Sequence, residues 1–227
     1  MKTAFLIDGD FFLRRYRRVY DANFSFDTGD ASIVTTQLFS MCQDHLKHWN
    51  RQSGIDRDLY RIFFYDAPPL KKRLHNPISK RAVNLEKSDV AIFRDALHAE
   101  LCKTRKVALR LGEVVSKGVT WKIKEHKQDE LLKGKIQFSD IQATDIEPNF
   151  IQKGVDLRIG LDIASMAYKK QVDQIILVSG DSDFVPAAKL ARREGVDFIL
   201  DPMWHRVSDD LLEHIDGLKS VCPKKAP

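Results

Sequence analysis

The spacing of apolar and polar residues predicts strands that alternate with helices along most of the chain. Apolar runs of strand length cover residues 3–7, 59–65, 107–115, 174–179 and 196–200. Helical periodicity covers residues 11–20, 32–50, 89–103, 156–170, 184–194 and 208–215. Because strands separated by helices form parallel βαβ units, we predict an α/β fold, a three-layer Rossmann-like domain around a central, mostly parallel sheet.

Two segments lack this periodicity. Residues 71–85 are polar, follow Pro68 and Pro69, and are predicted to be irregular. Residues 105–152 are rich in lysine, and we expect a basic β-hairpin and loop inserted into the domain there. The sequence therefore predicts a single domain at 1–217, with an insertion at about 105–152, followed by a short basic tail at 218–227.

The composition excludes some classes of protein. Apolar runs stay well short of the roughly 20 residues that span a bilayer. The first residues are not expected to act as a secretion signal, because their apolar stretch is short and no small-residue cleavage site follows. Cys42, Cys102 and Cys222 are scattered and odd in number, which indicates no disulfide framework and favours a cytoplasmic location. The oligomeric state is not indicated.

Basic residues are concentrated in a few parts of the chain. The net charge of +5 is a modest excess, which by itself only weakly favours an anionic partner. The positions say more: basic side chains gather directly after the first strand, in 71–81 and in the middle, and they include Arg14, Arg15, Arg17, Arg18, Lys71, Lys72, Arg73, Lys80, Arg81, Lys122 and Lys124. Trp121 beside Lys122 is suited to stacking on an unpaired base. A solvated lysine-rich surface is the alternative explanation.

Carboxylates, in contrast, follow the predicted strands. Asp8 ends the first strand, and Asp181 and Asp183 come directly after the strand at 174–179. Asp156 opens a predicted helix, and Asp162 lies within two turns of it. Asp66 ends the strand at 59–65. In parallel α/β folds, such positions face a ligand site at the carboxyl ends of the strands.

Several carboxylates at one edge of a sheet repel one another unless a cation neutralises them. Oxygen ligands suit Mg²⁺ or Mn²⁺, which align a water molecule and stabilise the charge that develops on a phosphodiester. We therefore expect a metal-dependent hydrolase of phosphodiester bonds, whose metal ligands come from these carboxylates, with Asp162 and Asp66 as the weakest candidates. The alternative for each residue is a helix cap, which accepts hydrogen bonds from backbone N–H groups.

Three segments carry a resemblance to a known family. FLIDGD at the start, QKGVDLRIGLDIASMA at 152–167 and LVSGDSDFVPAAKLARREGV at 177–196 resemble the NYN domain family, also called LabA-like or DUF88. This family is a branch of the PIN-like nucleases. The resemblance covers the two ends of the chain well and the middle poorly.

The resemblance implies a PIN-like domain, Mg²⁺ or Mn²⁺ as cofactor, and ribonuclease activity on RNA. It assigns the metal to Asp8, Asp156, Asp181 and Asp183, with Asp162 as a possible fifth ligand. Substrate contacts are expected from Ser179, Ser182, Asp10, Lys71, Arg73, Trp121 and Lys122. One departure concerns Phe11, which stands where many relatives have an asparagine; it removes a polar group beside Asp8 and puts a substrate contact in doubt.

Two other functions are open at this stage. The domain is alternatively a regulatory module that binds nucleic acid or protein without cutting. A haloacid-dehalogenase-like phosphatase is a further alternative, because Asp8-Gly9-Asp10 resembles the D-x-D motif of those enzymes and Gly180-Asp181 resembles their later acidic motif. Phe12, however, stands where a Thr or Val usually follows that D-x-D motif.

Overall fold

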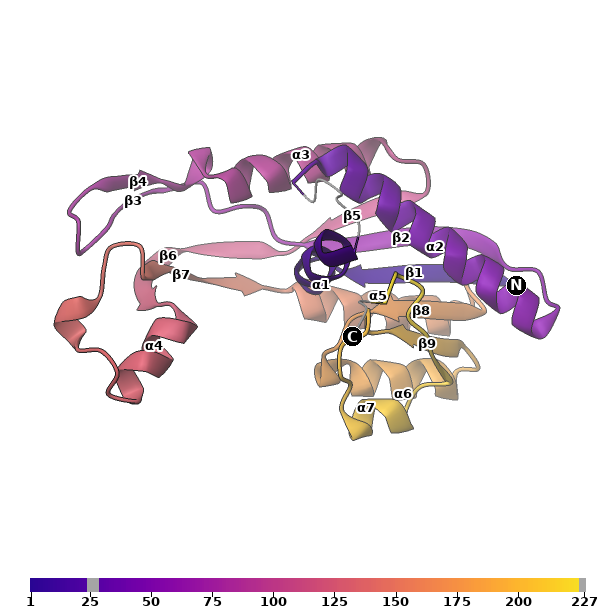
Figure 1. Ribbon diagram of the computed structural model, residues 1–227. Coiled ribbons are helices and arrows are strands. Elements are labelled where there is room, and N and C mark those ends of the chain that lie inside the picture. The colour runs from indigo at the N-terminus through magenta and orange to yellow at the C-terminus, as the bar shows by residue number, and fades with distance from the viewer. Residues whose placement is uncertain (24–28, 225–227) are drawn as a thin grey trace.

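The computed structural model describes residues 1–23 and 29–224 and contains a central sheet of six strands. The strands are in the order β10-β9-β8-β1-β2-β5, and neighbours pair in parallel (Figure 1). Their bounds are β1 (Lys2–Asp8), β2 (Asp58–Asp66), β5 (Val107–Leu111), β8 (Gln174–Val178), β9 (Asp197–Asp201) and β10 (Gly217–Leu218). The predicted α/β class with a central parallel sheet is confirmed.

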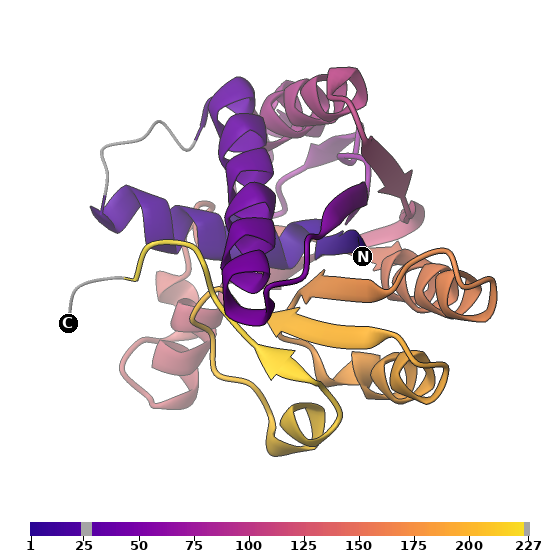
Figure 2. The same ribbon diagram turned by 90° about the vertical axis from the view of Figure 1, so that its right-hand side faces the viewer.

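Helices cover both faces of this sheet. The first face is covered by α1 (Gly9–Asn23), α2 (Ala31–Ser53) and α3 (Asp89–Lys103). The second is covered by α5 (Val155–Tyr168), α6 (Val185–Arg193) and α7 (Asp209–Glu213). Figure 2 shows α5 and α6 on one side of the twisted sheet and α2 on the other. In the described part of the chain, no helix combines the length and the apolar character needed to cross a membrane.

The central strand β1 shows why the sheet needs both layers. Its residues from Thr3 to Ile7 are all fully buried. Alternate side chains of a strand point to opposite faces, so Phe5 and Ile7 join the core under α1 and α2, while Ala4 and Leu6 join the core under α5 and α6. A continuous apolar run of this kind is stable only where both faces are covered.

The order of the strands creates a switch point between β1 and β8. From β1 the chain moves outward through β2 to β5, then returns to β8 on the other side of β1 and moves outward again through β9 to β10. Ligands of open parallel sheets bind beyond the carboxyl ends of the two strands at such a point. Asp8 ends β1, and Ser179 directly follows β8, so both lie at this position.

Two antiparallel hairpins extend from the sheet, on the left in Figure 1. One pairs β3 (Arg73–His75) with β4 (Ala82–Asn84) and leads through the 3₁₀ helix η1 (Leu85–Lys87) into α3. The other pairs β6 (Glu113–Ile123) with β7 (Ile146–Lys153) and carries α4 (Glu125–Leu132) and the 3₁₀ helix η2 (Phe138–Asp140) at its end. The hairpin predicted in the middle of the chain is therefore present.

Three details of the sequence analysis are corrected here. The predicted strand at 107–115 divides at Gly112: β5 pairs with β2 in the central sheet, so the hairpin begins at Glu113 and not near residue 105. The segment 71–85 is not irregular throughout, but β3 and β4 are three residues long and largely exposed, so they leave no alternating pattern. Helix α4 has no buried residue and hence no apolar stripe to reveal it.

The division of the chain into one domain at 1–217 and a tail at 218–227 stays a prediction. Leu218 is part of β10, and the carbonyl of Cys222 accepts a hydrogen bond from the Trp204 indole at 2.8 Å, so the first residues of the expected tail contact the domain. Residues 225–227 lie outside the described residues.

Gly9 makes the turn from β1 into α1 possible. A Cβ atom at this position would lie 2.6 Å from the carbonyl oxygen of Tyr65 and 2.7 Å from the ring of Phe64, which is fully buried. We predict that Gly9→Ala lowers the free energy of unfolding by about 1 to 3 kcal/mol, because neither group has room to move.

Gly160→Ala is the matched control. Gly160 lies inside α5, and no atom comes within 4 Å of a Cβ built there. We expect this change to be neutral or to stabilise the protein by about 0.5 to 1 kcal/mol, since alanine is the better helix former. Urea unfolding of both variants measures the difference, and equal midpoints would contradict the role of Gly9.

Candidate metal centre and nucleic-acid interface

A polar pocket lies at the switch point between β1 and β8. Its volume is about 240 Å³. The residues that line it come from the ends of β1, β2, β7 and β8 and from the starts of α1 and α5: Asp8, Asp10, Arg14, Tyr65, Asp66, Gln152, Gly154, Val155, Asp156 and Asp181. We call it the acidic pocket. Three of the four predicted metal ligands, Asp8, Asp156 and Asp181, therefore line one pocket.

Asp8 is held in place from two sides. Its Oδ1 accepts a hydrogen bond from the backbone N–H of Phe11 at 3.1 Å, and its Oδ2 accepts one from the Ser179 hydroxyl at 3.3 Å. The pKa of Asp8 is raised to about 6, first by burial and then by the nearby carboxylates of Asp156 and Asp10, against the lowering effect of the Phe11 N–H. Asp8 thus carries its negative charge at a free-energy cost in the metal-free protein.

Ser179 and Asp181 bring the end of β8 to the same pocket. The buried hydroxyl of Ser179, besides contacting Asp8, accepts a hydrogen bond from the N–H of Asp181 at 3.3 Å. Asp181 accepts one from the N–H of Asp183 at 2.9 Å and so caps the 3₁₀ helix η3 (Ser182–Phe184). Asp181 is consequently both a cap and a pocket residue, and the two interpretations of it are compatible.

The ring of Phe11 packs directly against Gly180. A Cβ at Gly180 would lie 2.8 Å from the ring of Phe11 and 3.0 Å from that of His205. Phe11 is only 7% exposed, and its ring meets His205 edge-on with the centroids 6.0 Å apart. The aromatic side chain that replaces the family's asparagine thus packs against the loop that carries Asp181.

Asp156 reaches the pocket from the first turn of α5. Gly154, at the N-cap position, has a left-handed φ of 80°, which lets the chain turn sharply from β7 into the helix. The pKa of Asp156 is raised, first by partial burial and then by the charges of Asp181 and Asp183. Asp183 is exposed and does not line the pocket, but its charge acts on Asp156.

The donor set of the pocket fits a hard divalent cation. The candidate ligands are carboxylate oxygens, which Mg²⁺ and Mn²⁺ prefer. Besides burial, a neighbouring carboxylate raises the pKa of two of them: Asp156 acts on Asp8, and Asp181 acts on Asp156. Within residues 1–23 and 29–224, however, no three of these carboxylates bring oxygen atoms within 4.8 Å of one another. Mg²⁺ keeps several water ligands, so an open arrangement of this kind suits binding partly through water.

One network that the sequence analysis missed lines the pocket. Arg94 of α3 donates from Nη1 to Asp66 at 2.6 Å and from Nη2 to Asp10 at 2.8 Å. Asp66 is 1% exposed and also contacts Nε2 of His98 at 2.8 Å, while Asp10 pairs with Arg14 at 2.7 Å. Both oxygens of Asp66 are therefore engaged by side chains of α3, and Asp66 is not a helix cap. The spacing of Arg94 and His98, four residues apart on one face of a predicted helix, could have indicated in the sequence that they bind a shared carboxylate.

The structure does not bring every predicted residue to the acidic pocket. Asp162 lines a separate pocket, where its Oδ2 accepts a hydrogen bond from the Tyr65 hydroxyl at 2.8 Å and lies 3.3 Å from Nε of Arg110. Ser182 is exposed on η3. The predicted substrate-binding residues of the hairpins, Lys71, Arg73, Trp121 and Lys122, lie outside the pocket lining as well.

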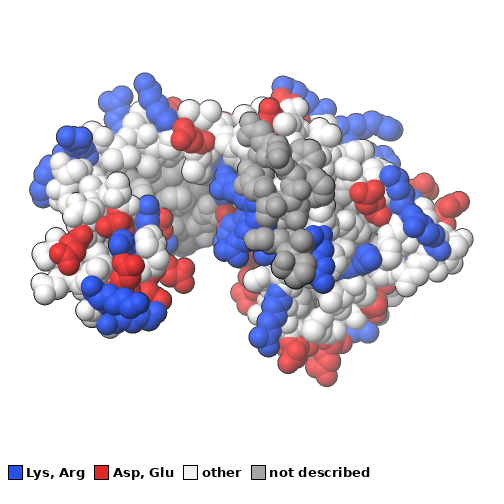
Figure 3. All heavy atoms as spheres, in the orientation of Figure 1, with Lys and Arg blue, Asp and Glu red and all other residues white. Residues whose placement is uncertain are grey.

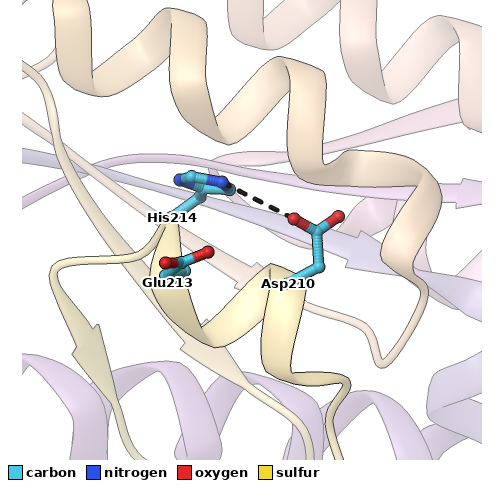
Figure 4. Close-up of side chains that lie close together, drawn as sticks. All are labelled: Asp210, Glu213 and His214. Atoms are coloured by element: carbon cyan, nitrogen blue, oxygen red, sulfur yellow. Dashed lines mark ion pairs between the residues drawn. The ribbon is translucent and has the colours of Figure 1, made fainter.

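A second acidic group lies on the surface, away from the pocket lining. Among the described residues, Asp210, Glu213 and His214 form the one group whose ligand atoms lie within 4.8 Å of one another (Figure 4). Asp210 and Glu213 are exposed, and His214 Nε2 lies 3.6 Å from Asp210 Oδ1. Exposed groups on a five-residue helix commonly approach in this way without a metal, so we assign no site here.

Positive charge is concentrated next to the acidic pocket. Helix α1 carries Arg14, Arg15, Arg17 and Arg18. Figure 3 shows Lys and Arg side chains gathered in the middle of the face, beside the position of α1, and further basic side chains along the β3–β4 hairpin. The α4 end of the other hairpin shows both signs of charge. Positive charge around an acidic pocket is the arrangement that a polyanionic ligand requires.

The raised pKa of Asp8 leads to a prediction for the metal-free protein. The pKa of Asp8 in the folded state is about 6, against 3.8 as the ordinary value, so the folded protein binds this proton more tightly than the unfolded chain does. Protonation of Asp8 therefore stabilises the fold fully below about pH 3.8, and this contribution is lost as the pH rises through 6. We predict that Asp8→Asn, in EDTA, raises the free energy of unfolding by about 1 to 2 kcal/mol at pH 7.5 and by much less at pH 4.5.

Urea unfolding at both pH values measures this difference. Asp58→Asn, which removes an exposed carboxylate at the start of β2, is the control and should change stability little at either pH. A destabilised Asp8→Asn protein at pH 7.5 would show that the hydrogen bonds from Phe11 and Ser179 outweigh the cost of burying the charge.

Comparisons with known proteins identify the family of the chain. The NYN domain model matches residues 84–213, which is more than half of the chain and includes Asp156, Asp181 and Asp183. A search of curated proteins finds no match. A crystal structure of a protein of unknown function from Vibrio parahaemolyticus is similar over 97% of this chain and 92% of that chain, with 18% identity and a TM-score of 0.45. The chain belongs to the NYN domain family of the PIN-like nuclease superfamily.

Proposed function

We propose that this protein is a metal-dependent nuclease that hydrolyses phosphodiester bonds of single-stranded RNA. The observation that carries the proposal is the meeting of Asp8, Asp156 and Asp181 in one pocket at the switch point of the sheet. These residues come from positions far apart in the sequence, and backbone capping alone does not require that they meet. Membership of the NYN family supports a nuclease, and the choice of RNA follows the resemblance to that family.

In this proposal Asp8, Asp156 and Asp181 hold Mg²⁺ or Mn²⁺, with Asp183 close enough to contribute charge. A cation bound there supplies a water molecule of lowered pKa and neutralises charge on the phosphate. The protein's own residues set the geometry. Ser179 fixes Oδ2 of Asp8, and the Phe11 N–H fixes Oδ1, so this carboxylate keeps one orientation in the pocket.

The arginines have two separate roles in the proposal. Arg94 is 13% exposed and bound to two carboxylates, so it keeps Asp10 and Asp66 in position at the wall of the pocket. Arg14 is 67% exposed and lies at the pocket, where its guanidinium is available to a phosphate group despite its contact with Asp10. Lys71, Arg73 and Lys122 on the hairpins extend the positive surface along which a strand binds.

The other functions make different demands on the same residues. A phosphatase of the haloacid-dehalogenase type needs Asp10 as a free acid or base, whereas this side chain is bound by Arg14 and Arg94. A regulatory module that binds RNA without cutting remains the alternative of a different class. Among the described residues, no three of these carboxylates have oxygens within 4.8 Å of one another, which is compatible with that module, and metal binding distinguishes the two functions.

Metal binding is the first testable consequence. We predict that Mn²⁺ at a hundredfold excess over its Kd raises the melting temperature of the protein by about 5 to 10 °C. Asp8→Asn should abolish most of this increase, because a neutral amide replaces a charged ligand. Asp210→Asn, in the exposed group of Figure 4, is the control and should leave the increase intact. The opposite pattern would move the metal site to α7.

Cleavage is the second consequence. We expect labelled single-stranded RNA to be cut with Mg²⁺ or Mn²⁺ and to stay intact in EDTA. Asp181→Asn should slow cleavage by at least about 100-fold, since even partners outside the first ligand layer cost 10- to 100-fold. Ser179→Ala removes one such partner of Asp8, and its rate of cleavage should lie between that of Asp181→Asn and that of the wild type.

Gel shifts on the same RNA separate the two classes of function. Cleavage that disappears in Asp181→Asn, while binding persists, establishes the nuclease. Intact RNA in every condition, with binding equal in wild type and variant, would instead support the regulatory module. Release of inorganic phosphate from small phosphomonoesters would support the phosphatase.

A further inference from the structure

A second, apolar pocket lies beside the acidic pocket. Its volume is about 360 Å³, and its walls come from the loop after β2, from η1 and α3, and from β7: Asp10, Pro68, Pro69, Leu70, Leu85, Ser88, Val90, Ala91, Arg94, Glu147, Pro148, Phe150 and Gln152. Asp10 and Gln152 also line the acidic pocket. The two pockets are therefore neighbours that share a wall.

The lining of the apolar pocket has the chemistry of a nucleobase site. Pro68, Pro148 and Phe150 are half-buried and offer apolar surface to the faces of a flat ring. Gln152 offers hydrogen-bonding groups to its edges, whereas the Ser88 hydroxyl already donates to the carbonyl of Leu85 at 2.6 Å and accepts from the N–H of Ala91 at 3.3 Å. Small-molecule sites combine apolar walls with a few convergent polar groups in this way.

The backbone of the hairpin is irregular at the point where Phe150 lies. Val115 of β6 pairs with residue 151 of β7, and the next pair is Thr120 with Asn149. Four residues of β6 therefore lie between these two pairs, whereas β7 has only Phe150 there. Such bulges re-aim side chains and are frequent next to active sites. Trp121 pairs with Pro148, and directly paired residues share a face, so Trp121 lies on the same face of the hairpin as Pro148 without lining the pocket itself.

Charge at the rim complements a nucleic-acid strand. Lys71 directly follows Leu70 of the lining and pairs with Asp95 at 2.9 Å. Lys122 pairs with Glu147 of the lining at 3.1 Å. Both lysines are at least half exposed, so their charge is available to phosphates on either side of the pocket.

We propose that the apolar pocket binds one unpaired base of the RNA strand, the base of a nucleotide next to the phosphodiester held in the acidic pocket. This inference rests on the proposed function. A base that is paired in a duplex cannot enter a pocket with walls on opposite sides, so the pocket selects single-stranded substrate. Phe150 stacks on the base, and the shared wall sets a fixed spacing between the base and the scissile bond.

An abasic scan tests the proposal. In a labelled RNA that the wild-type protein cuts, each nucleotide in turn is replaced by an abasic one, and the rate of cleavage is measured. We expect the rate to fall by about 5- to 150-fold when the missing base lies at one fixed distance from the cut, and little elsewhere. A duplex across that position should be cut more slowly than the single strand.

The Phe150→Ala variant should cut intact RNA more slowly than the wild type by a similar factor. It should cut the sensitive abasic RNA at the same rate as the wild type, because stacking on the base is already absent there. Phe138→Ala is the matched control: Phe138 is a 75% exposed aromatic residue on η2, outside both pocket linings, and should behave like the wild type. The scan on the wild-type protein needs no variant, so it decides the question even where Phe150→Ala folds poorly.

Each outcome has a distinct meaning. Cleavage that is equally fast on every abasic RNA overturns the base site and leaves the nuclease standing. The same holds for an abasic effect that keeps its full size in Phe150→Ala. Failure of the wild-type protein to cut any RNA with Mg²⁺ or Mn²⁺ overturns the proposed function and this inference together.

Discussion

β1 and β8 lie side by side with almost every side chain buried, and this parallel pairing places Asp8 and Ser179 at the same edge of the sheet. Neither strand has another way to bury both of its faces. The carboxylate of Asp8 is therefore forced into a pocket that other carboxylates also enter, and its pKa rises to about 6. The apolar core thus brings carboxylates close together at its edge, and the proposed cation would neutralise their repulsion.

The arginine network limits this conflict. Asp66 is almost fully buried, and a buried charge without partners is strongly destabilising. Arg94 of α3 forms an ion pair with it, His98 of the same helix contacts its other oxygen, and Arg94 also reaches Asp10 in the first turn of α1. One guanidinium thereby connects the end of β2, the start of α1 and the middle of α3. Asp10 and Asp66 are thereby held in the wall of the acidic pocket. Asp8, Asp156 and Asp181 are the carboxylates to which we assign the proposed cation.

The β6–β7 hairpin supplies part of the lining of the apolar pocket, next to the acidic pocket. The central sheet ends at the carboxylates, and it offers no apolar surface beyond them for a base. Phe150 and Pro148 on β7, together with Leu85 of η1 and Val90 of α3, supply that surface. The acidic pocket is the feature that the PIN-like fold predicts, whereas the apolar pocket depends on an insertion whose sequence shows little periodicity.

The sequence by itself determined the parallel α/β fold and three of the pocket carboxylates. Buried strands such as 3–7 and 174–178 are unbroken apolar runs, and the residues that follow such strands must lie at one edge of a parallel sheet. Local patterns carry that information, and the NYN resemblance added the expectation of ribonuclease activity. Only the tertiary structure separated Asp162 from the pocket and joined Arg94 to Asp10 and Asp66. Contacts between residues far apart in the chain decide these points, because neither the turn of a helix nor the spacing of a strand records which distant carboxylate a side chain will meet.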